Sequence, residues 1–75
     1  MKELLEFIAK SLVEDASAVS VEVVETDDVM TLKLHVAEGD MGKVIGKQGR
    51  IAKAIRTIVK ASSVHSDKKY VVDIL

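Results

Sequence analysis

The residues best suited to chemistry lie together in one short segment, residues 44–51, with the sequence VIGKQGRI. Gly46 and Gly49 stand three positions apart, and glycine adopts backbone angles closed to other residues and leaves room for a ligand beside the main chain. A helix is expected after Gly49, so its first N–H groups and its positive dipole end would face the loop. The N-terminus of a helix therefore suits a phosphate. With the charges of Lys47 and Arg50, the segment predicts capture of a nucleic-acid backbone.

The charge is divided along the chain, although the total is only −1. Residues 1–39 hold three lysines and nine acids, a net charge of −6, whereas residues 40–60 hold six basic residues and one acid, a net charge of +5. A local excess of positive charge attracts phosphates even when the whole domain is weakly acidic. The basic part of the chain is the part that contains the glycine loop.

Length and composition limit the classes of protein. A chain of 75 residues is long enough for one domain with a small core, so we expect a single domain over residues 1–75. The absence of cysteine excludes a disulfide framework and a thiolate metal site, and fits a reducing cytoplasmic location. Glu6 and Lys10 interrupt the first apolar segment, so we expect no signal peptide, no membrane insertion and a soluble protein.

Three helices are expected from hydrophobic periodicity. Residues 2–14 carry apolar side chains at spacings of three, four and seven, and residues 50–61 combine an apolar side with basic residues at spacings of three and four. A short helix should precede the loop at residues 41–45, and Asp40 is expected to cap its N-terminus.

Alternation of apolar and polar residues predicts three strands, at residues 19–23, 30–36 and 70–75. Asp27 and Asp28 supply a turn, so the first two strands should form an antiparallel hairpin. The last strand follows two helices, which requires a crossover and implies a parallel pair. We therefore expect an α+β domain in the order helix, strand, strand, helix, helix, strand, with a three-stranded mixed sheet and the helices on one face.

The loop and the elements around it resemble a KH domain, whose signature is a G-x-x-G loop between two helices, and the element order is typical of the type II arrangement. Residues 40–50 (DMGKVIGKQGR) and 54–59 (AIRTIV) are similar to the KH-domain protein A family of bacteria. The resemblance spans the whole chain. It implies a non-catalytic protein that binds single-stranded RNA, acts as an RNA chaperone or post-transcriptional regulator, and is linked to cell shape and envelope growth. It also implies homodimers and heterodimers with a larger bacterial KH protein.

The resemblance further implies that the loop clamps the RNA backbone and that an apolar groove beside it receives the bases. The loop residues here are Gly46, Lys47, Gln48 and Gly49. The groove would be built from Val44, Ile45, Ile51, Ala52 and Ile55, with the last strand or the connector before it as the far wall. Additional phosphate contacts would come from Lys43, Arg50, Lys53 and Arg56. RNA targets and base preference, and the choice between RNA and single-stranded DNA, stay open.

Two other classes were weighed against RNA binding. An enzyme is disfavoured because residues 42–48 resemble a nucleotide-binding P-loop only superficially: three residues separate Gly42 from Gly46 where that motif has four, and Gln48 replaces the magnesium-binding Ser or Thr. We expect no catalysis, cofactor or metal. A protein–protein interaction module stays open, because the apolar side of residues 50–61 is wider than one small core needs. Its surplus edge, Ala54, Ile58 and Ala61, would form a dimer interface.

Overall fold

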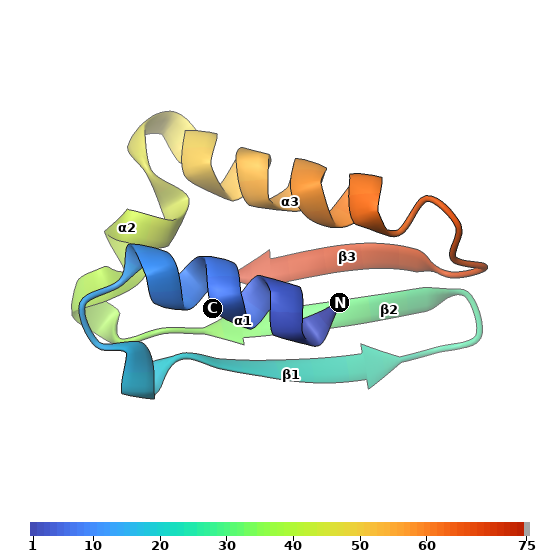
Figure 1. Ribbon diagram of the computed structural model, residues 1–75, viewed down its shortest axis with the longest axis horizontal. Coiled ribbons are helices and arrows are strands. Elements are labelled where there is room, and N and C mark those ends of the chain that lie inside the picture. Colours follow the sequence, from blue (N-terminus) through green and yellow to red (C-terminus); the bar gives the residue numbers. More distant parts are fainter. Residues whose placement is uncertain (75) are drawn as a thin grey trace.

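The computed structural model describes residues 1–74, and its elements follow the expected order (Figure 1). They are α1 (Lys2–Leu12), β1 (Ser20–Glu25), β2 (Val29–His35), α2 (Met41–Ile45), α3 (Arg50–Ser62) and β3 (Lys69–Ile74), with short 3₁₀ turns at Ala16–Ala18, Glu38–Asp40 and Lys47–Gly49. The type II KH arrangement expected from the sequence is confirmed. Leu75, which was expected to end the last strand, lies outside the described residues.

The sheet has the order β1-β2-β3 and is mixed, as predicted. β1 pairs with β2 in antiparallel fashion and places Val21 opposite Leu34, while β2 pairs with β3 in parallel and places Leu32 beside Val72. The hairpin turn is closed by Thr26, whose N–H donates to the Val29 carbonyl oxygen at 2.8 Å. The parallel pair arises because α2 and α3 carry the chain back along the sheet (Figure 1).

The core lies between the sheet and the two long helices. Leu5 and Ala9 of α1 and Ile55 and Val59 of α3 are almost fully buried against Leu32, Leu34 and Val72 of the sheet. Burying one such aliphatic side chain stabilises the fold by about 1.5–3 kcal/mol. Both helices thereby fix the position of the segment between β2 and α3. Within residues 1–74, no helix is long and apolar enough to cross a membrane.

Asp40 departs from its expected role. It stands at the N-cap position of α2 but makes no side-chain cap hydrogen bond. Its buried carboxylate instead accepts hydrogen bonds from the backbone N–H groups of Glu14, at 3.3 Å, and Asp15, at 3.1 Å. The expected cap was therefore wrong, because the two amides that follow the end of α1 lie close enough to take the carboxylate. This contact ties α1 to the start of α2.

Candidate nucleic-acid interface

The loop between α2 and α3 is held in a conformation that depends on its glycines. Gly46 has φ 73° and ψ 177°, and Gly49 has φ 73° and ψ 15°, both at positive φ. Gln48 also has a positive φ, of 58°. Three positive-φ residues within four positions turn the chain sharply from α2 into α3. At this bend Lys47 and Gln48 are exposed residues.

Two backbone hydrogen bonds brace the bend. The N–H of Gly46 donates to the Gly42 carbonyl at 2.8 Å, and the N–H of Gly49 donates to the Gly46 carbonyl at 3.3 Å. Lys47 and Gln48 lie between these two bonds and are exposed. An exposed glycine-containing bend that leads into a helix N-terminus suits an anion such as a phosphate oxygen.

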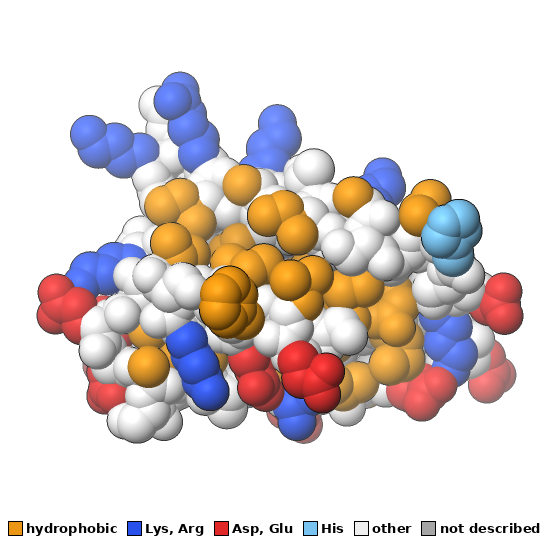
Figure 2. Space-filling view, viewed as in Figure 1, with side chains coloured by type: hydrophobic (Ala, Val, Ile, Leu, Met, Phe, Trp, Pro, Cys, Tyr) orange, Lys and Arg blue, Asp and Glu red, His pale blue; other side chains and the backbone are white. Residues whose placement is uncertain are grey.

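Most of the basic side chains expected around the loop are exposed. Lys47, Arg50 and Lys53 point into solvent near it, and Figure 2 shows Lys and Arg side chains projecting along the edge that carries α3 and the loop. Arg50 approaches Gln48, with its guanidinium 3.5 Å from Oε1. Arg56 is anchored farther along α3, because its Nε donates to the Val72 carbonyl of β3 at 3.3 Å. The structure thus gathers four cations from the loop to the middle of α3.

Among the basic residues expected around the loop, Lys43 differs in having carboxylate partners in the part of the chain that the structure describes. Its ammonium lies 2.8 Å from a Glu14 oxygen and 3.6 Å from an Asp40 oxygen. The Glu14 carboxylate, with Asp40 behind it, raises the pKa of Lys43. The Asp15 amide, followed by the Glu14 amide and the Lys43 charge, lowers the pKa of Asp40. Lys43 must leave Glu14 before it can contact a phosphate.

We expect Asp40→Asn to lower the melting temperature at neutral pH. The melting temperature of this variant should also change less than that of the parent as the pH is lowered. Because the folded-state pKa lies below the ordinary value of 3.8, Asp40 stabilises the fold at pH above 3.8 and loses that effect as pH falls from 3.8 through the lower pKa of the folded state. Thermal melts over this pH range measure the effect. Asp67→Asn, at an exposed position, is the matched control and should follow the parent. Parallel curves for parent and Asp40→Asn would contradict the role of the carboxylate.

Four of the apolar residues expected in the base-binding groove differ in exposure, and the fifth, Ala52, is buried. Val44 and Ile55 are buried, at 0% and 2% exposed, whereas Ile45 is 37% exposed and Ile51 is half-buried. Ile51 also packs closely under the loop: a Cβ added to Gly46 would lie 2.6 Å from its Cγ1. The surface available to a ligand is therefore formed by Ile45 and Ile51, with the other two beneath it.

A groove runs between α3 and the outer edge of β3. It has a volume of about 270 Å³ and is lined by Arg56, Lys60, Lys69, Tyr70, Val71 and Val72. The sequence pointed to the last strand as a far wall, but it did not place Lys69 or Tyr70 in the site, since only two aromatic residues in the chain made a stacking platform improbable. The signal that could have found them is the lone tyrosine of the chain, placed directly after two lysines.

The expected dimer edge is exposed on the other side of α3. Ala54, Ile58 and Ala61 all face solvent, with Ile58 43% exposed. Phe7 of α1, which sequence reasoning did not include, is 71% exposed. Figure 2 shows hydrophobic side chains gathered over α1 and α3 on the face toward the viewer. An exposed apolar area on two helices is typical of a contact surface.

Two comparisons with known proteins found matches over nearly the whole chain. Residues 2–74 match the family model described as KhpA/KhpB, KH domain. The chain is 57% identical over 75 residues to the RNA-binding protein KhpA of Clostridium perfringens and to that of Clostridium acetobutylicum, covering all of each chain. It is 51% identical over 75 residues to the RNA-binding protein KhpA of Listeria monocytogenes, covering all of this chain and 99% of that protein. The comparison with solved structures found no match.

Proposed function

The chain belongs to the KhpA/KhpB KH-domain family, and from this premise we propose that it binds single-stranded RNA without catalysis. The observation that carries the proposal is the exposed loop at the start of α3, bent by Gly46 and Gly49, with Lys47 and Gln48 at its tip. In this proposal a phosphate placed over the loop accepts hydrogen bonds from N–H groups at the start of α3 and neutralises nearby charge. Had the loop been buried, the proposal would have had no support.

In this proposal each expected residue has a place. Gly46 and Gly49 shape the bend, and the RNA backbone lies over the residues between them. Arg50, Lys53 and Arg56 contact flanking phosphates, and Lys43 does so only after it releases Glu14. Bases lie on Ile45 and Ile51, while Val44 and Ile55 support that surface from the core. A cytoplasmic location, RNA chaperoning and a link to cell shape and envelope growth stay predictions from the family resemblance.

Salt dependence tests this binding mode. Affinity for a fluorescent single-stranded RNA should fall as salt rises, with a log–log slope of about −0.7 for each phosphate contacted. Two to four contacts predict a slope between about −1.4 and −2.8. A titration series at several salt concentrations measures it. An RNA affinity that does not change with salt concentration would rule out phosphate capture and favour the second candidate function.

The second candidate is an interaction module that pairs with itself or with a larger KH protein. It is supported by the exposure of Ile58 and Phe7, which leaves apolar surface uncovered on α1 and α3. An isologous contact would bury the same edge, Ala54, Ile58 and Ala61, on both copies. The small alanine side chains allow the two helices to approach closely.

We expect Ile58→Asp to halve the sedimenting mass, because it places a charge in the centre of this apolar edge. Sedimentation velocity compares it with the parent and with Thr57→Asp, a matched control at the exposed neighbouring position of the same helix. A parent that sediments as a monomer, or an unchanged dimer mass in Ile58→Asp, would exclude this contact.

A further inference from the structure

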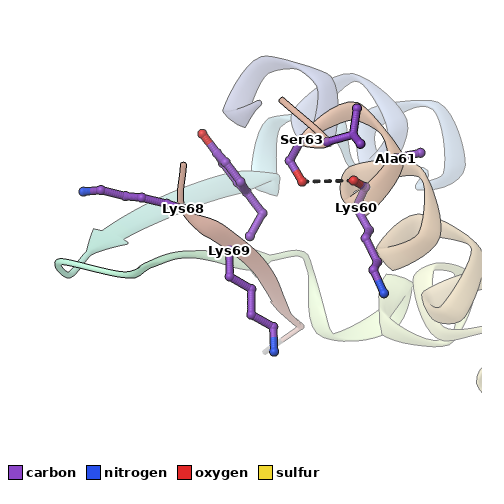
Figure 3. Close-up of a pocket in the computed structure, with 7 residues that line it drawn as sticks. Lys60, Ala61, Ser63, Lys68 and Lys69 are labelled. Atoms are coloured by element: carbon purple, nitrogen blue, oxygen red, sulfur yellow. Dashed lines mark hydrogen bonds between the residues drawn. The ribbon is translucent and has the colours of Figure 1, made fainter. Parts of the chain in front are cut away.

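A second hollow opens at the C-terminal end of α3, away from the glycine loop. It has a volume of about 630 Å³, within the range of sites for small organic groups, and we call it the terminal hollow. Its lining includes Lys60, Ala61, Val64, Lys68, Lys69 and Tyr70. Residues from α3, the connector and β3 thus meet around one space (Figure 3).

The terminal hollow combines an apolar wall with a positive rim. Ala61, Val64 and Tyr70 provide the wall, and Val64 is 72% exposed. Lys68 is paired with Glu25, but within residues 1–74 no carboxylate pairs with Lys60 or Lys69. Figure 3 shows Lys60 and Lys69 extending toward the same side of the hollow, while Lys68 points away from them. Two cations without a carboxylate partner, beside a wall that contains a tyrosine ring, suit a nucleotide. Its planar base can stack on the ring, and its phosphate carries the negative charge.

The terminal hollow is continuous with the groove between α3 and β3. It shares Lys60, Lys69 and Tyr70 with the groove between α3 and β3, in which Arg56 lies nearer the loop. Arg50 and Lys60 are ten positions apart, about 15 Å along a helix. At a stacked spacing of about 3.4 Å per nucleotide, that distance corresponds to roughly four or five nucleotides.

We propose that the terminal hollow is a second RNA subsite, which takes a base against Tyr70 while Lys60 and Lys69 hold the adjoining phosphates. The inference rests on the proposed function and extends it: the protein grips a longer segment of one strand than the loop alone covers. The base packs against the apolar wall, and the charged RNA backbone stays at the rim of the hollow beside the lysines. Binding then depends on strand length as well as on the loop.

Oligonucleotide length provides the first measurement. An eight-nucleotide RNA should bind about tenfold or more tightly than a four-nucleotide RNA, as expected for one further base on an aromatic ring. The chain has one tyrosine and no tryptophan, so its intrinsic fluorescence reports Tyr70 alone. The longer RNA should quench this emission and the shorter one should not. N-acetyl-tyrosinamide with the same RNA corrects for absorption.

Abasic RNAs separate base insertion from phosphate contact. Two eight-nucleotide strands are needed, one without bases in its 5′ half and one without bases in its 3′ half. The quenching of Tyr70 should disappear with one strand and persist with the other, which also gives the direction of the strand. Equal quenching by both abasic strands, or by the four-nucleotide RNA, would overturn the proposal.

Charge-matched variants locate the effect. Lys60→Gln with Lys69→Gln should remove the affinity gained from four to eight nucleotides and leave the four-nucleotide affinity unchanged. Lys10→Gln with Lys33→Gln makes the same change of charge away from the hollow and should keep the gain. A gain that survives in the hollow variant overturns this subsite while loop binding stands. A parent that binds neither RNA overturns the proposed function itself, and the subsite with it.

Discussion

Replacing Lys47 and Gln48 together by aspartate is expected to lower RNA affinity at least about tenfold without unfolding the domain. The loss of one charge-assisted hydrogen bond, about 1.5–3 kcal/mol, corresponds to about 10- to 150-fold in affinity. The two carboxylates also repel the phosphates. Both side chains are exposed, and aspartate tolerates the left-handed backbone of Gln48, where φ is 58°. Titration of a fluorescent RNA measures affinity, and far-UV circular dichroism checks the fold.

The matched control for this variant is Lys2→Asp with Ser20→Asp. It makes the same change of net charge at two exposed positions outside the loop, and acid is tolerated in the first turn of α1. Its affinity should stay within a few-fold of the parent. If the loop variant bound RNA as tightly as the parent, the assignment of the loop would be wrong. If both variants lost affinity equally, the effect would come from total charge.

Gly46→Ala is expected to have the largest effect on stability of any single substitution in the loop. Its φ of 73° with ψ of 177° belongs to a region that is essentially restricted to glycine, at a cost of about 1–3 kcal/mol for other residues. The added Cβ would also lie 2.6–2.9 Å from three carbons of Ile51. Such overpacking costs about 1–3 kcal/mol more. A domain of 75 residues has a total stability of roughly 4–11 kcal/mol, so a large part of it would be lost.

Gly49→Ala provides the matched comparison for Gly46→Ala. Gly49 also has a positive φ, of 73°, but a Cβ added there would meet no atom within 4 Å. Its cost should be that of the left-handed conformation alone, about 1–2 kcal/mol. Urea unfolding of both variants gives the two free energies. Equal destabilisation would contradict the close packing of Gly46 on Ile51.

The elements of the fold were predictable because their patterns are strong and local. Alternation identified β2 to within one residue at each end, and the apolar periodicity of residues 50–61 marked α3, which the structure extends to Ser62. The parallel pairing of β2 with β3 also followed, since two helices between them require a crossover. The expected end of α1 at residue 14 was less accurate. The helix ends at Leu12, and Val13 is extended.

The contacts of charged residues were not predictable in this way. Asp40 looked like a helix cap in sequence, yet its partners are the backbone amides of Glu14 and Asp15, about 25 positions away. Lys43 looked like a free cation beside the loop, yet it pairs with Glu14. Such partners depend on how α1 packs against α2. No local pattern contains that information.

The sequence by itself determined the order of the elements, the position of the glycine loop and the clustering of positive charge in residues 40–60, since each depends on residue type and spacing along the chain. Only the tertiary structure decided which apolar residues beside the loop reach solvent, which lysines are paired, and that Tyr70 of β3 closes a hollow at the far end of α3. The physical reason is that burial and ion pairing are set by neighbours distant in the chain, and these come together only when the helices pack on the sheet.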